Sequence, residues 1–373
     1  MTPLAPGSTI GILGGGQLGR MLAQAAAQLG YRVHVYAPEA DSVAAEVCAR
    51  FTRAQWDDAA AMAEFAADCA VVTYEFENVP VGPLKALGSV PLHPNARALE
   101  VAQDRLNEKE FVEQLGGRKA PYMAVDTRED LDAALVRIGS PGILKTRREG
   151  YDGKGQWRIN SEHDADGIAV AGQALVYEGL VRFTAEFSVI LVRGTDGRIA
   201  FWDSAENVHS GGILALSTAP ASAEVQAQVE EARALAAKVA EGLGYVGVAA
   251  FEFFATADGP VFNEMAPRVH NSGHWTIEGA VTSQFENHIR AICGLPLGDT
   301  RLAAAKVEMR NIIGDAAEDW AGLLADPANH LHLYGKGEAR PGRKMGHVTC
   351  LGATVDEALA TARAIRAGLR IDG

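Results

Sequence analysis

Residues 249–266 read AAFEFFATADGPVFNEMA, two apolar runs on either side of a short Asp-Gly turn. Asp-Gly between alternating apolar runs is a strong signal for a β-hairpin. Each run carries one glutamate, Glu252 or Glu264, and a hairpin symmetric about Asp258 places the two side chains directly opposite each other. This pairing depends on the register, because a slip of one residue turns the two side chains to opposite faces of the sheet.

The two opposed glutamates predict a site for a divalent cation. Like charges directly opposite each other across a sheet are destabilising, and an unpaired charge among apolar residues costs still more. Mg²⁺ between Glu252 and Glu264 removes this conflict, because it takes oxygen ligands and is bound together with substrate phosphates. Two glutamates that both face solvent are the alternative.

The chain before this hairpin divides into an α/β part and an α+β part. Strand-like runs at 9–13, 32–36 and 70–74 alternate with helical patterns, which predicts an open parallel α/β domain. A second predicted hairpin, with arms at 186–192 and 199–208, indicates that the centre of the chain forms antiparallel pairs.

The tail predicts a small β-rich domain that closes with a helix near 359–369. Its expected strands lie near 306–313, 330–334 and 345–351. The predicted fold class is therefore mixed α/β and α+β, in four parts: 1–118, 119–183, 184–300 and 301–373.

Composition excludes several classes of protein. The 373 residues carry a net charge of −13, so general binding to a nucleic-acid backbone is not expected. No apolar run approaches the ~18 residues of a membrane span, and no basic, then apolar leader begins the chain. Cys48, Cys69, Cys293 and Cys350 lie far apart, which is typical of reduced thiols. We therefore expect a cytoplasmic protein without a membrane partner.

A glycine-rich turn, GGGQLG at 14–19, lies between the first predicted strand and a helix. Its glycines have G-x-G-x-x-G spacing, and backbone amides at a helix N-terminus can bind phosphate. Glu39 follows Gly19 by 20 positions, as a dinucleotide site requires. Dinucleotide binding, another phosphate ligand and close packing alone all remain open for this motif.

A second glycine-rich segment, REGYDGKGQ at 148–156, predicts a loop that wraps polyphosphate through its amides and Lys154. It does not match the P-loop pattern G-x-x-x-x-G-K-[ST]. Lys145 lies on the preceding predicted strand and adds a second cation. A solvated hairpin tip is the alternative.

Polar donors follow the predicted metal strand. Arg268, His270, Asn271 and His274 lie within NEMAPRVHNSGHW at 263–275, and Arg offers a planar fork for carboxylate, carbonate or phosphate. This spacing favours an anion site over isolated structural residues. The tail adds a basic cluster, Lys336, Arg340, Arg343 and Lys344, for which a solvated loop is the alternative.

Together these motifs resemble the ATP-grasp carboxylate–amine ligases, in the branch that serves de novo purine synthesis. They occur in family order along nearly the whole chain, as GILGGGQLGRM (11–21), TYEFENV (73–79), QDR (103–105), GYDGKGQ (150–156), YEGLV (177–181), FNEMAPRVHNSGHWT (262–276) and RPGRKMGH (340–347). The segments GGGQLGRM and RVHNSGHWT are specific to this branch.

The resemblance implies an ATP-grasp fold with a pre-ATP-grasp α/β domain, and a homodimer that uses ATP and Mg²⁺. The implied reaction phosphorylates bicarbonate to carboxyphosphate, and the exocyclic amine of 5-aminoimidazole ribonucleotide then takes up the carboxyl group. The products are N5-carboxyaminoimidazole ribonucleotide, ADP and phosphate.

The resemblance also implies a role for each matching residue. For the nucleotide, these are Arg105 and Lys145; the closing loop Gly150, Tyr151, Asp152, Gly153, Lys154, Gly155 and Gln156; the adenine hinge Glu178, Gly179, Leu180 and Val181; Glu186 at the ribose; and His209. Asn263, Glu264 and Glu252 belong to the metal. The residues implied for carbonate are Arg268, His270 and Asn271, with Tyr151, Asp152 and Lys336. The residues implied for the ribonucleotide are Gln17, Glu75 and Glu77, with Arg343 and Lys344 at its 5′-phosphate.

Three alternatives remain at this point. Another ATP-grasp ligase, such as a formate-using glycinamide ribonucleotide enzyme or a biotin carboxylase, has the same fold and a different acid or amine. A nicotinamide-dependent oxidoreductase would use the first glycine motif, but it leaves the glutamate pair and the Lys154 loop unexplained. A non-catalytic nucleotide-binding regulator would not need to keep both the metal and the loop residues.

Overall fold

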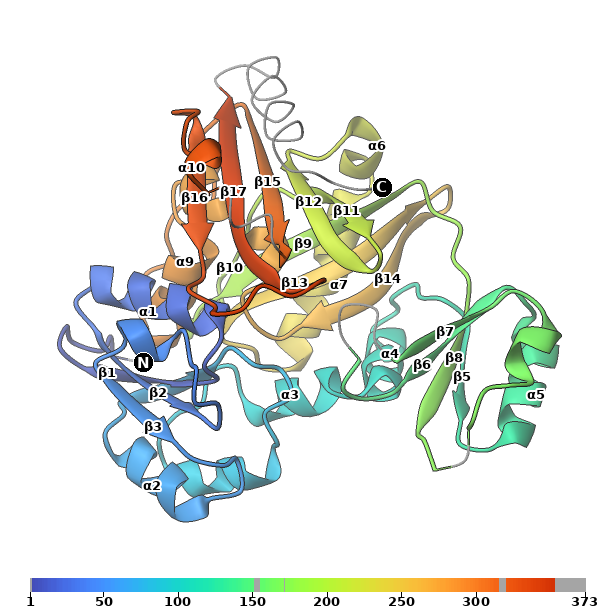
Figure 1. Ribbon diagram of the computed structural model, residues 1–373, viewed down its shortest axis with the longest axis horizontal. Coiled ribbons are helices and arrows are strands. Elements are labelled where there is room, and N and C mark those ends of the chain that lie inside the picture. Colours follow the sequence, from blue (N-terminus) through green and yellow to red (C-terminus); the bar gives the residue numbers. More distant parts are fainter. Residues whose placement is uncertain (1, 151–154, 171, 315–319, 353–373) are drawn as a thin grey trace.

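Figure 1 shows the computed structural model, which describes residues 2–150, 155–170, 172–314 and 320–352. The N-terminal α/β part packs against a large central sheet, and a smaller sheet stands apart from both (Figure 1). Tyr151, Asp152, Gly153, Lys154 and the helix expected near 359–369 lie outside the described residues. No helix in the described part of the chain is long and apolar enough to cross a membrane.

The N-terminal part is the open parallel sheet that the strand–helix alternation predicts. Its strands are β1 (Thr9–Leu13), β2 (Arg32–Ala37), β3 (Arg50–Arg53) and β4 (Val71–Tyr74), in the order β3-β2-β1-β4. Helices α1 (Gln17–Gln28) and α2 (Ala59–Ala67) connect them. The buried face of α1 shares one apolar core with α9 (Gln284–Ile292), so the N-terminal part packs against the central part of the chain.

Within the described residues, the central sheet has nine strands, and all of its strand pairs are antiparallel. They are β9 (Ala185–Arg193), β10 (Ile199–Phe201), β11 (Ala205–Ser210), β12 (Ile213–Ala219), β13 (Gly247–Thr256), β14 (Gly259–Ala266), β15 (Lys306–Ile313), β16 (Asn329–Leu333) and β17 (Lys344–Gly352). The order is β14-β13-β9-β11-β12-β15-β17-β16, with β10 paired to β9. The three strands of the tail therefore extend the sheet that carries the glutamate hairpin.

The arm predicted at 199–208 is wrong in one respect, since it is two strands and not one. β10 and β11 both pair with β9, and Trp202–Ser204 separate them. The Trp202 side chain is fully buried and its indole N–H donates to the carbonyl of Thr282 at 2.9 Å. Burial of this large side chain in the core accounts for the break.

The smaller sheet is antiparallel and has its own core. Its strands are β5 (Tyr122–Val125), β6 (Gly142–Thr146), β7 (Gln156–Ile159) and β8 (Leu175–Gly179), in the order β5-β8-β6-β7. α5 (Arg128–Ile138) contributes Leu131, Ala134 and Leu135 to that core. The remaining α-helices are α3 (Ala96–Ala102), α4 (Arg105–Gln114), α6 (Ala223–Gln226), α7 (Val229–Gly242), α8 (Thr276–Gly279) and α10 (Trp320–Leu323).

The β13–β14 hairpin pairs Glu252 with Glu264, as predicted, but not through a symmetric turn. Thr256 pairs with Gly259 and Phe253 with Phe262, a register that would place Glu252 opposite Asn263. A bulge at Asn263 shifts the pairing by one residue, so that Glu252 faces Glu264. The predicted contact is confirmed, and the predicted symmetry about Asp258 is wrong.

Candidate active site

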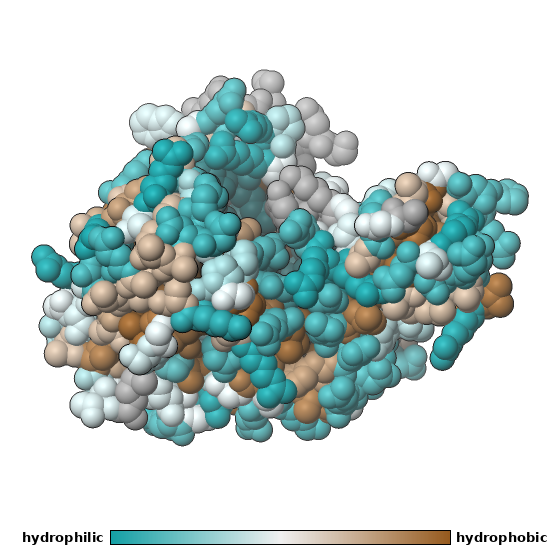
Figure 2. All heavy atoms as spheres, turned by 90° about the horizontal axis from the view of Figure 1, so that it is seen from below, coloured by the Kyte–Doolittle hydropathy of each residue, from teal (hydrophilic) through white to brown (hydrophobic). Residues whose placement is uncertain are grey.

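A cleft of about 830 Å³ lies where the three sheets meet. Its lining comes from the glycine turn at 14–18, residues 75–78 after β4, and residues 264–268, 270 and 271, with Arg105 and Gly150. The loop between β16 and β17 with the first residue of β17, here called the tail loop, contributes Lys336 and residues 340–344. Figure 2 shows hydrophilic side chains around the hollow between the small-sheet lobe and the rest of the molecule. The described residues predicted for bicarbonate and the ribonucleotide therefore lie around one cavity, together with Arg105 and Glu264. Its lining does not include several described residues that were predicted for the nucleotide and the metal: Lys145, 178–181, Glu186, His209, Glu252 and Asn263.

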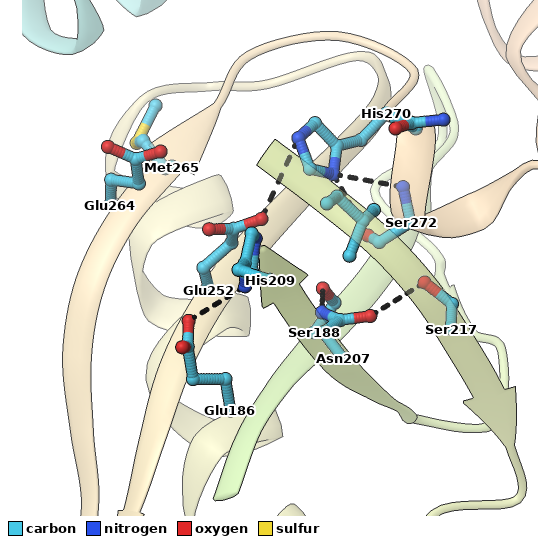
Figure 3. A network of polar contacts seen from close by, with 12 residues as sticks. Glu186, Ser188, Asn207, His209, Ser217, Glu252, Glu264, Met265, His270 and Ser272 are labelled. Carbon is cyan, nitrogen blue, oxygen red and sulfur yellow. Dashed lines mark hydrogen bonds and ion pairs between the residues drawn. The ribbon is translucent and has the colours of Figure 1, made fainter. Parts of the chain in front are cut away.

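Glu264 lines this cleft, and Glu252 lies beside it on the neighbouring strand (Figure 3). Burial and the neighbouring Glu264 raise the pKa of Glu252 to about 7. Burial acts in the same direction on Glu264, but Arg105, whose guanidinium donates to Glu264 Oε2 at 2.8 Å, outweighs it and lowers the pKa of Glu264. One carboxylate of the pair therefore has a counterion, while the other lacks a strong one.

This donor set fits Mg²⁺ bound together with phosphates. The two carboxylates are adjacent, and a cation between them would offset the repulsion from Glu264 that, together with burial, raises the pKa of Glu252. Among the described residues, no group of three or more His, Cys, Asp or Glu could enclose a metal by itself. A magnesium ion here would thus take its other ligands from substrate and water.

Buried cations line the side of the site formed by α4, β6 and β8. The ammonium of Lys145 donates to Glu178 Oε2 at 3.0 Å, and Lys109 Nζ lies 3.2 Å from Glu178 Oε1. The two lysines and Arg105 outweigh burial and hold the pKa of Glu178 at about 2. Burial lowers the pKa of Lys145. The Glu178 side chain thus points to cations, which leaves its backbone and Gly179–Val181 for an adenine.

The opposite side of the site carries imidazole and amide groups. His270 Nδ1 accepts from the Ser272 N–H at 3.3 Å, so the ring proton is assigned to Nε2, which lies 3.7 Å from Glu252 Oε1 (Figure 3). Burial and Arg268 lower the pKa of His270 well below its usual value, so the ring is neutral. Asn271 exchanges two amide hydrogen bonds with Asn311, at 2.9 and 2.7 Å.

One ion pair and one row of three polar side chains lie near the glutamates (Figure 3). His209 Nδ1 lies 3.1 Å from Glu186 Oε2 (Figure 3). Burial alone would lower the pKa of His209, but the hydrogen bond with Glu186 and the charge of Glu252 raise it. Next to them, the Asn207 amide donates to Ser188 Oγ at 2.6 Å and accepts from Ser217 Oγ at 2.7 Å, which satisfies a buried polar row across three strands.

The first glycine motif holds a side chain of this chain itself. Glu75, at the end of β4, accepts from the Gly16 N–H at 2.8 Å and the Gly19 N–H at 3.3 Å. A Cβ at Gly14, whose φ is +117°, would lie 2.5 Å from Glu75 Oε1, so only glycine fits there. The anion-binding end of α1 is thus filled by a carboxylate, and the dinucleotide alternative for this motif does not fit.

The tail loop reaches the same cleft from the far side. Lys336, Arg343 and Lys344 line it together with Gln17, and the ammonium of Lys336 donates to the Lys344 carbonyl at 2.9 Å. Across the cleft, Arg268 pairs with Glu77 and donates to the Val269 carbonyl at 3.0 Å. Two residues predicted for different ligands, Arg268 and Glu77, therefore contact each other.

The sequence analysis missed several residues that build this site. Glu108 and Lys109 follow Arg105 by three and four positions, the spacing that places side chains on one face of a helix. Gln284, at the start of α9, accepts from the His270 N–H at 3.0 Å and donates to the His270 carbonyl at 2.6 Å. Only the helical spacing after Arg105 could have been recognised in advance, because Gln284 and Asn311 come from distant segments.

Three family models match consecutive parts of the chain. They are the ribonucleotide synthetase preATP-grasp domain over residues 7–103, the ATP-grasp domain over 110–285 and the phosphoribosylaminoimidazole carboxylase C-terminal domain over 308–361. These matches agree with the pre-ATP-grasp and ATP-grasp fold that the motifs imply.

Individual relatives match along nearly their whole length. The chain is 51% identical over 354 residues to the N5-carboxyaminoimidazole ribonucleotide synthase of Brucella melitensis, covering 93% of this chain and 97% of that relative. The crystal structure of N5-carboxyaminoimidazole ribonucleotide synthetase from Thermus thermophilus matches with a TM-score of 0.90 at 46% identity, covering 97% and 99%. The Aspergillus clavatus synthase in complex with ADP and 5-aminoimidazole ribonucleotide matches with a TM-score of 0.90 at 33% identity, covering 98% and 100%.

Proposed function

The chain belongs to the N5-carboxyaminoimidazole ribonucleotide synthases, which are ATP-grasp ligases, and we propose that its cleft activates bicarbonate with ATP before the ribonucleotide amine attacks. As a member of this family it is a C–N ligase of purine biosynthesis, which carboxylates 5-aminoimidazole ribonucleotide at the expense of ATP. The proposals below concern which residues carry each part of that reaction.

ATP is proposed to bind between the small sheet and the central sheet. Lys145 and Arg105 supply cations for its phosphates, and the segment Glu178–Val181 supplies backbone groups for adenine. His209 and Glu186, whose side chains are 3.1 Å apart, are also assigned to the nucleotide. The loop from Gly150 to Gln156 closes over the phosphates, and its residues 151–154 lie outside the described part of the chain.

Magnesium is proposed to bind at Glu252 and Glu264, next to Asn263. When bound, Mg²⁺ neutralises charge on the transferring phosphoryl group. Arg105 holds Glu264 in place from α4, and His270 contacts Glu252 from the other side. These contacts orient both carboxylates toward the cleft.

Bicarbonate is proposed to bind next to the glutamate pair, against His270, Arg268 and Asn271. Bicarbonate is a weak nucleophile, so attack on the γ-phosphorus requires that it be held close and in line. Arg268 offers a planar donor fork and His270 directs Nε2–H into the site. Lys336 approaches from the tail loop, with Tyr151 and Asp152 assigned to the closing loop.

The ribonucleotide is proposed to bind between the N-terminal part and the tail loop. Arg343 and Lys344 line the cleft and would neutralise its 5′-phosphate, and Gln17, Glu75 and Glu77 line the facing wall. Its amine would then meet carboxyphosphate beside His270. Carboxyphosphate hydrolyses readily, which makes exclusion of water by the closing loop necessary.

One observation carries this assignment more than any other. Glu252 and Glu264 are adjacent carboxylates on neighbouring strands, and Glu264 lines the same cavity as Arg105, His270 and the basic tail loop. A nicotinamide-dependent oxidoreductase leaves that pair of carboxylates unexplained.

An isotope experiment tests the acid that is activated. With ¹⁸O-bicarbonate, the released phosphate should carry one label, because the bridging oxygen stays with phosphorus when carboxyphosphate breaks down. Arg268→Lys keeps the charge and loses the planar fork, so it should lower labelled turnover more than it weakens ATP binding. Unlabelled phosphate, measured before bicarbonate exchanges with water, would mean that another acid is activated.

A homodimer and a cytoplasmic location are also proposed, and only the family resemblance supports them. Sedimentation velocity of the purified protein measures the oligomeric state directly. A monomer across the concentrations used for catalysis would contradict the first proposal.

A further inference from the structure

Helix α4 runs along the outer edge of β14, which is the edge strand of the central sheet. Edge strands leave one row of backbone N–H and C=O groups without strand partners. In β14 these groups are taken by other parts of the chain. The Phe262 N–H donates to the Arg118 carbonyl at 2.7 Å, and the Met265 N–H donates to the Glu108 carboxylate of α4 at 2.6 Å.

The contact with Glu108 occurs immediately after the bulge in β14. Glu108 is 2% exposed, and its Oε1 is the acceptor for Met265. Lys109, the next residue on α4, directs its ammonium to the carbonyl of Asn263, the bulged residue, at 3.5 Å. The backbone on both sides of Glu264 is thus attached to one helix.

The bulge decides which face of the sheet Glu264 occupies. Without it, the register at the turn would continue, and Glu252 would pair with Asn263. Glu264 would then lie opposite Phe251, on the face that holds the apolar core of Phe251, Phe253 and Phe262. A slip of one residue would therefore remove one carboxylate from the cleft.

We propose that Glu108 is a positioning residue that fixes the β14 bulge and thereby sets the register of the two site carboxylates. Its carboxylate occupies the Met265 N–H and keeps this end of β14 in the shifted register. Arg105, one turn earlier on the same helix, then contacts the Glu264 side chain itself. The purpose of this register rests on the metal site proposed above, but the contact between Glu108 and β14 does not depend on that site.

The test compares two substitutions of Glu108 with a matched control. Glu108→Gln replaces the carboxylate oxygen with an amide oxygen that can still accept the hydrogen bond. Glu108→Met removes the acceptor and keeps a side chain of similar size. Glu110→Met makes the same change at an exposed position of the same helix. If Glu108→Met does not fold, Glu108→Asp replaces it, because a side chain shorter by one methylene falls short of the Met265 N–H.

The first measurement is hydrogen exchange at the Met265 amide, which needs neither metal nor activity. Exchange should be at least about tenfold faster in Glu108→Met, or in Glu108→Asp, and near wild type in Glu108→Gln and Glu110→Met. Unchanged protection in the variant that lacks the acceptor overturns the proposal.

The second measurement is Mn²⁺ binding with ADP, followed by electron paramagnetic resonance. The dissociation constant of Mn²⁺ should rise at least about tenfold in Glu108→Met and recover in Glu108→Gln, while metal-free ADP binding stays the same. Wild-type Mn²⁺ affinity in a variant whose Met265 exchange has increased would also overturn the role. If Glu264→Gln binds Mn²⁺ as the wild type does, the metal site itself is wrong, and Met265 exchange still decides the role of Glu108.

Discussion

The two sides of the cleft that face the glutamate pair differ in charge. The side built by α4, β6 and β8 presents Arg105, Lys109 and Lys145, each in contact with a carboxylate of Glu178 or Glu264. The side built by the segment after β14 presents one cation, Arg268, beside the neutral His270 ring and the amide of Asn271. Cations thus predominate on the first side and neutral hydrogen-bonding groups on the second.

This difference matches the demands of the two proposed ligands. A polyphosphate brings several negative charges, and cations already paired with carboxylates can be transferred to it without leaving an isolated buried charge. Bicarbonate brings one charge and needs orientation, which Arg268 and the neutral hydrogen-bonding groups next to it would provide. Substitutions on the two sides should therefore affect different kinetic constants.

The largest effect is expected where the two sides meet. Glu264→Gln removes one of the two opposed carboxylates, so Mg²⁺-dependent ATP turnover should fall at least about tenfold, or about 1.4 kcal/mol. Folding should stay near wild type, because the weakened contact with Arg105 and the relief of repulsion from Glu252 oppose each other. Steady-state kinetics measure the ATP turnover and thermal unfolding measures the stability, with the exposed Glu110→Gln as control. Wild-type turnover would remove Glu264 from the metal site.

The charged side should act on ATP. Lys145→Met should raise the KM for ATP about tenfold, since a phosphate contact is lost. Lys109→Met should raise the KM for ATP about threefold. Of its two close lysine partners, Glu178 then keeps only Lys145 and holds Lys145 more tightly, which makes Lys145 less available to a phosphate. Neither change should move the KM for bicarbonate. The control is Lys238→Met at an exposed site on α7, and an effect on bicarbonate as large as that on ATP would contradict the division between the two sides.

Substitutions on the side that presents His270 should change the KM for bicarbonate. Gln284→Met removes both hydrogen bonds to the His270 backbone at nearly constant volume, so the KM for bicarbonate should rise about threefold to tenfold. The KM for ATP should stay within error of the wild type. Gln226→Met, exposed on α6, is the matched control. Equal changes in both constants would indicate a general loss of structure.

The effect furthest from catalysis is a pH dependence of stability in the metal-free protein. Burial and Glu264 raise the pKa of Glu252 from 4.5 to about 7, so the folded state holds a proton that the unfolded state has lost. Between these two values the unfolding free energy of the wild type should fall, relative to Glu252→Gln, by at most about 1.4 kcal/mol per pH unit. The groups that face Glu252 are Glu264, His209, Glu186, Lys344 and His270.

Urea unfolding of both proteins at several pH values measures that difference. Because both carry the same neighbours, their common pH dependence largely cancels in the comparison. Parallel curves between pH 5 and pH 7 would show that Glu252 is an ordinary solvated carboxylate.

The β13–β14 hairpin shows which features of this site can be predicted from the sequence and which cannot. The Asp-Gly turn and the alternating runs predict the strands and the opposed glutamates, because both follow from local patterns. The bulge at Asn263 leaves no such pattern, since it is stabilised by Glu108 from a distant helix. The glycine turn at 14–19 shows the same limit, because its occupant, Glu75, comes from the end of another strand.

The tail strands have a consequence for how the protein folds during synthesis. β12 pairs with β15, which is made only after α7, the β13–β14 hairpin and α9. Until β15 leaves the ribosome, β12 exposes an open edge, and such edges pair readily with other chains. The nascent chain therefore passes through a stage at which most of the ligand-binding residues have been made but three of the nine described strands of the central sheet, β15, β16 and β17, have not. We expect that interval to be the period in which this protein most depends on chaperones.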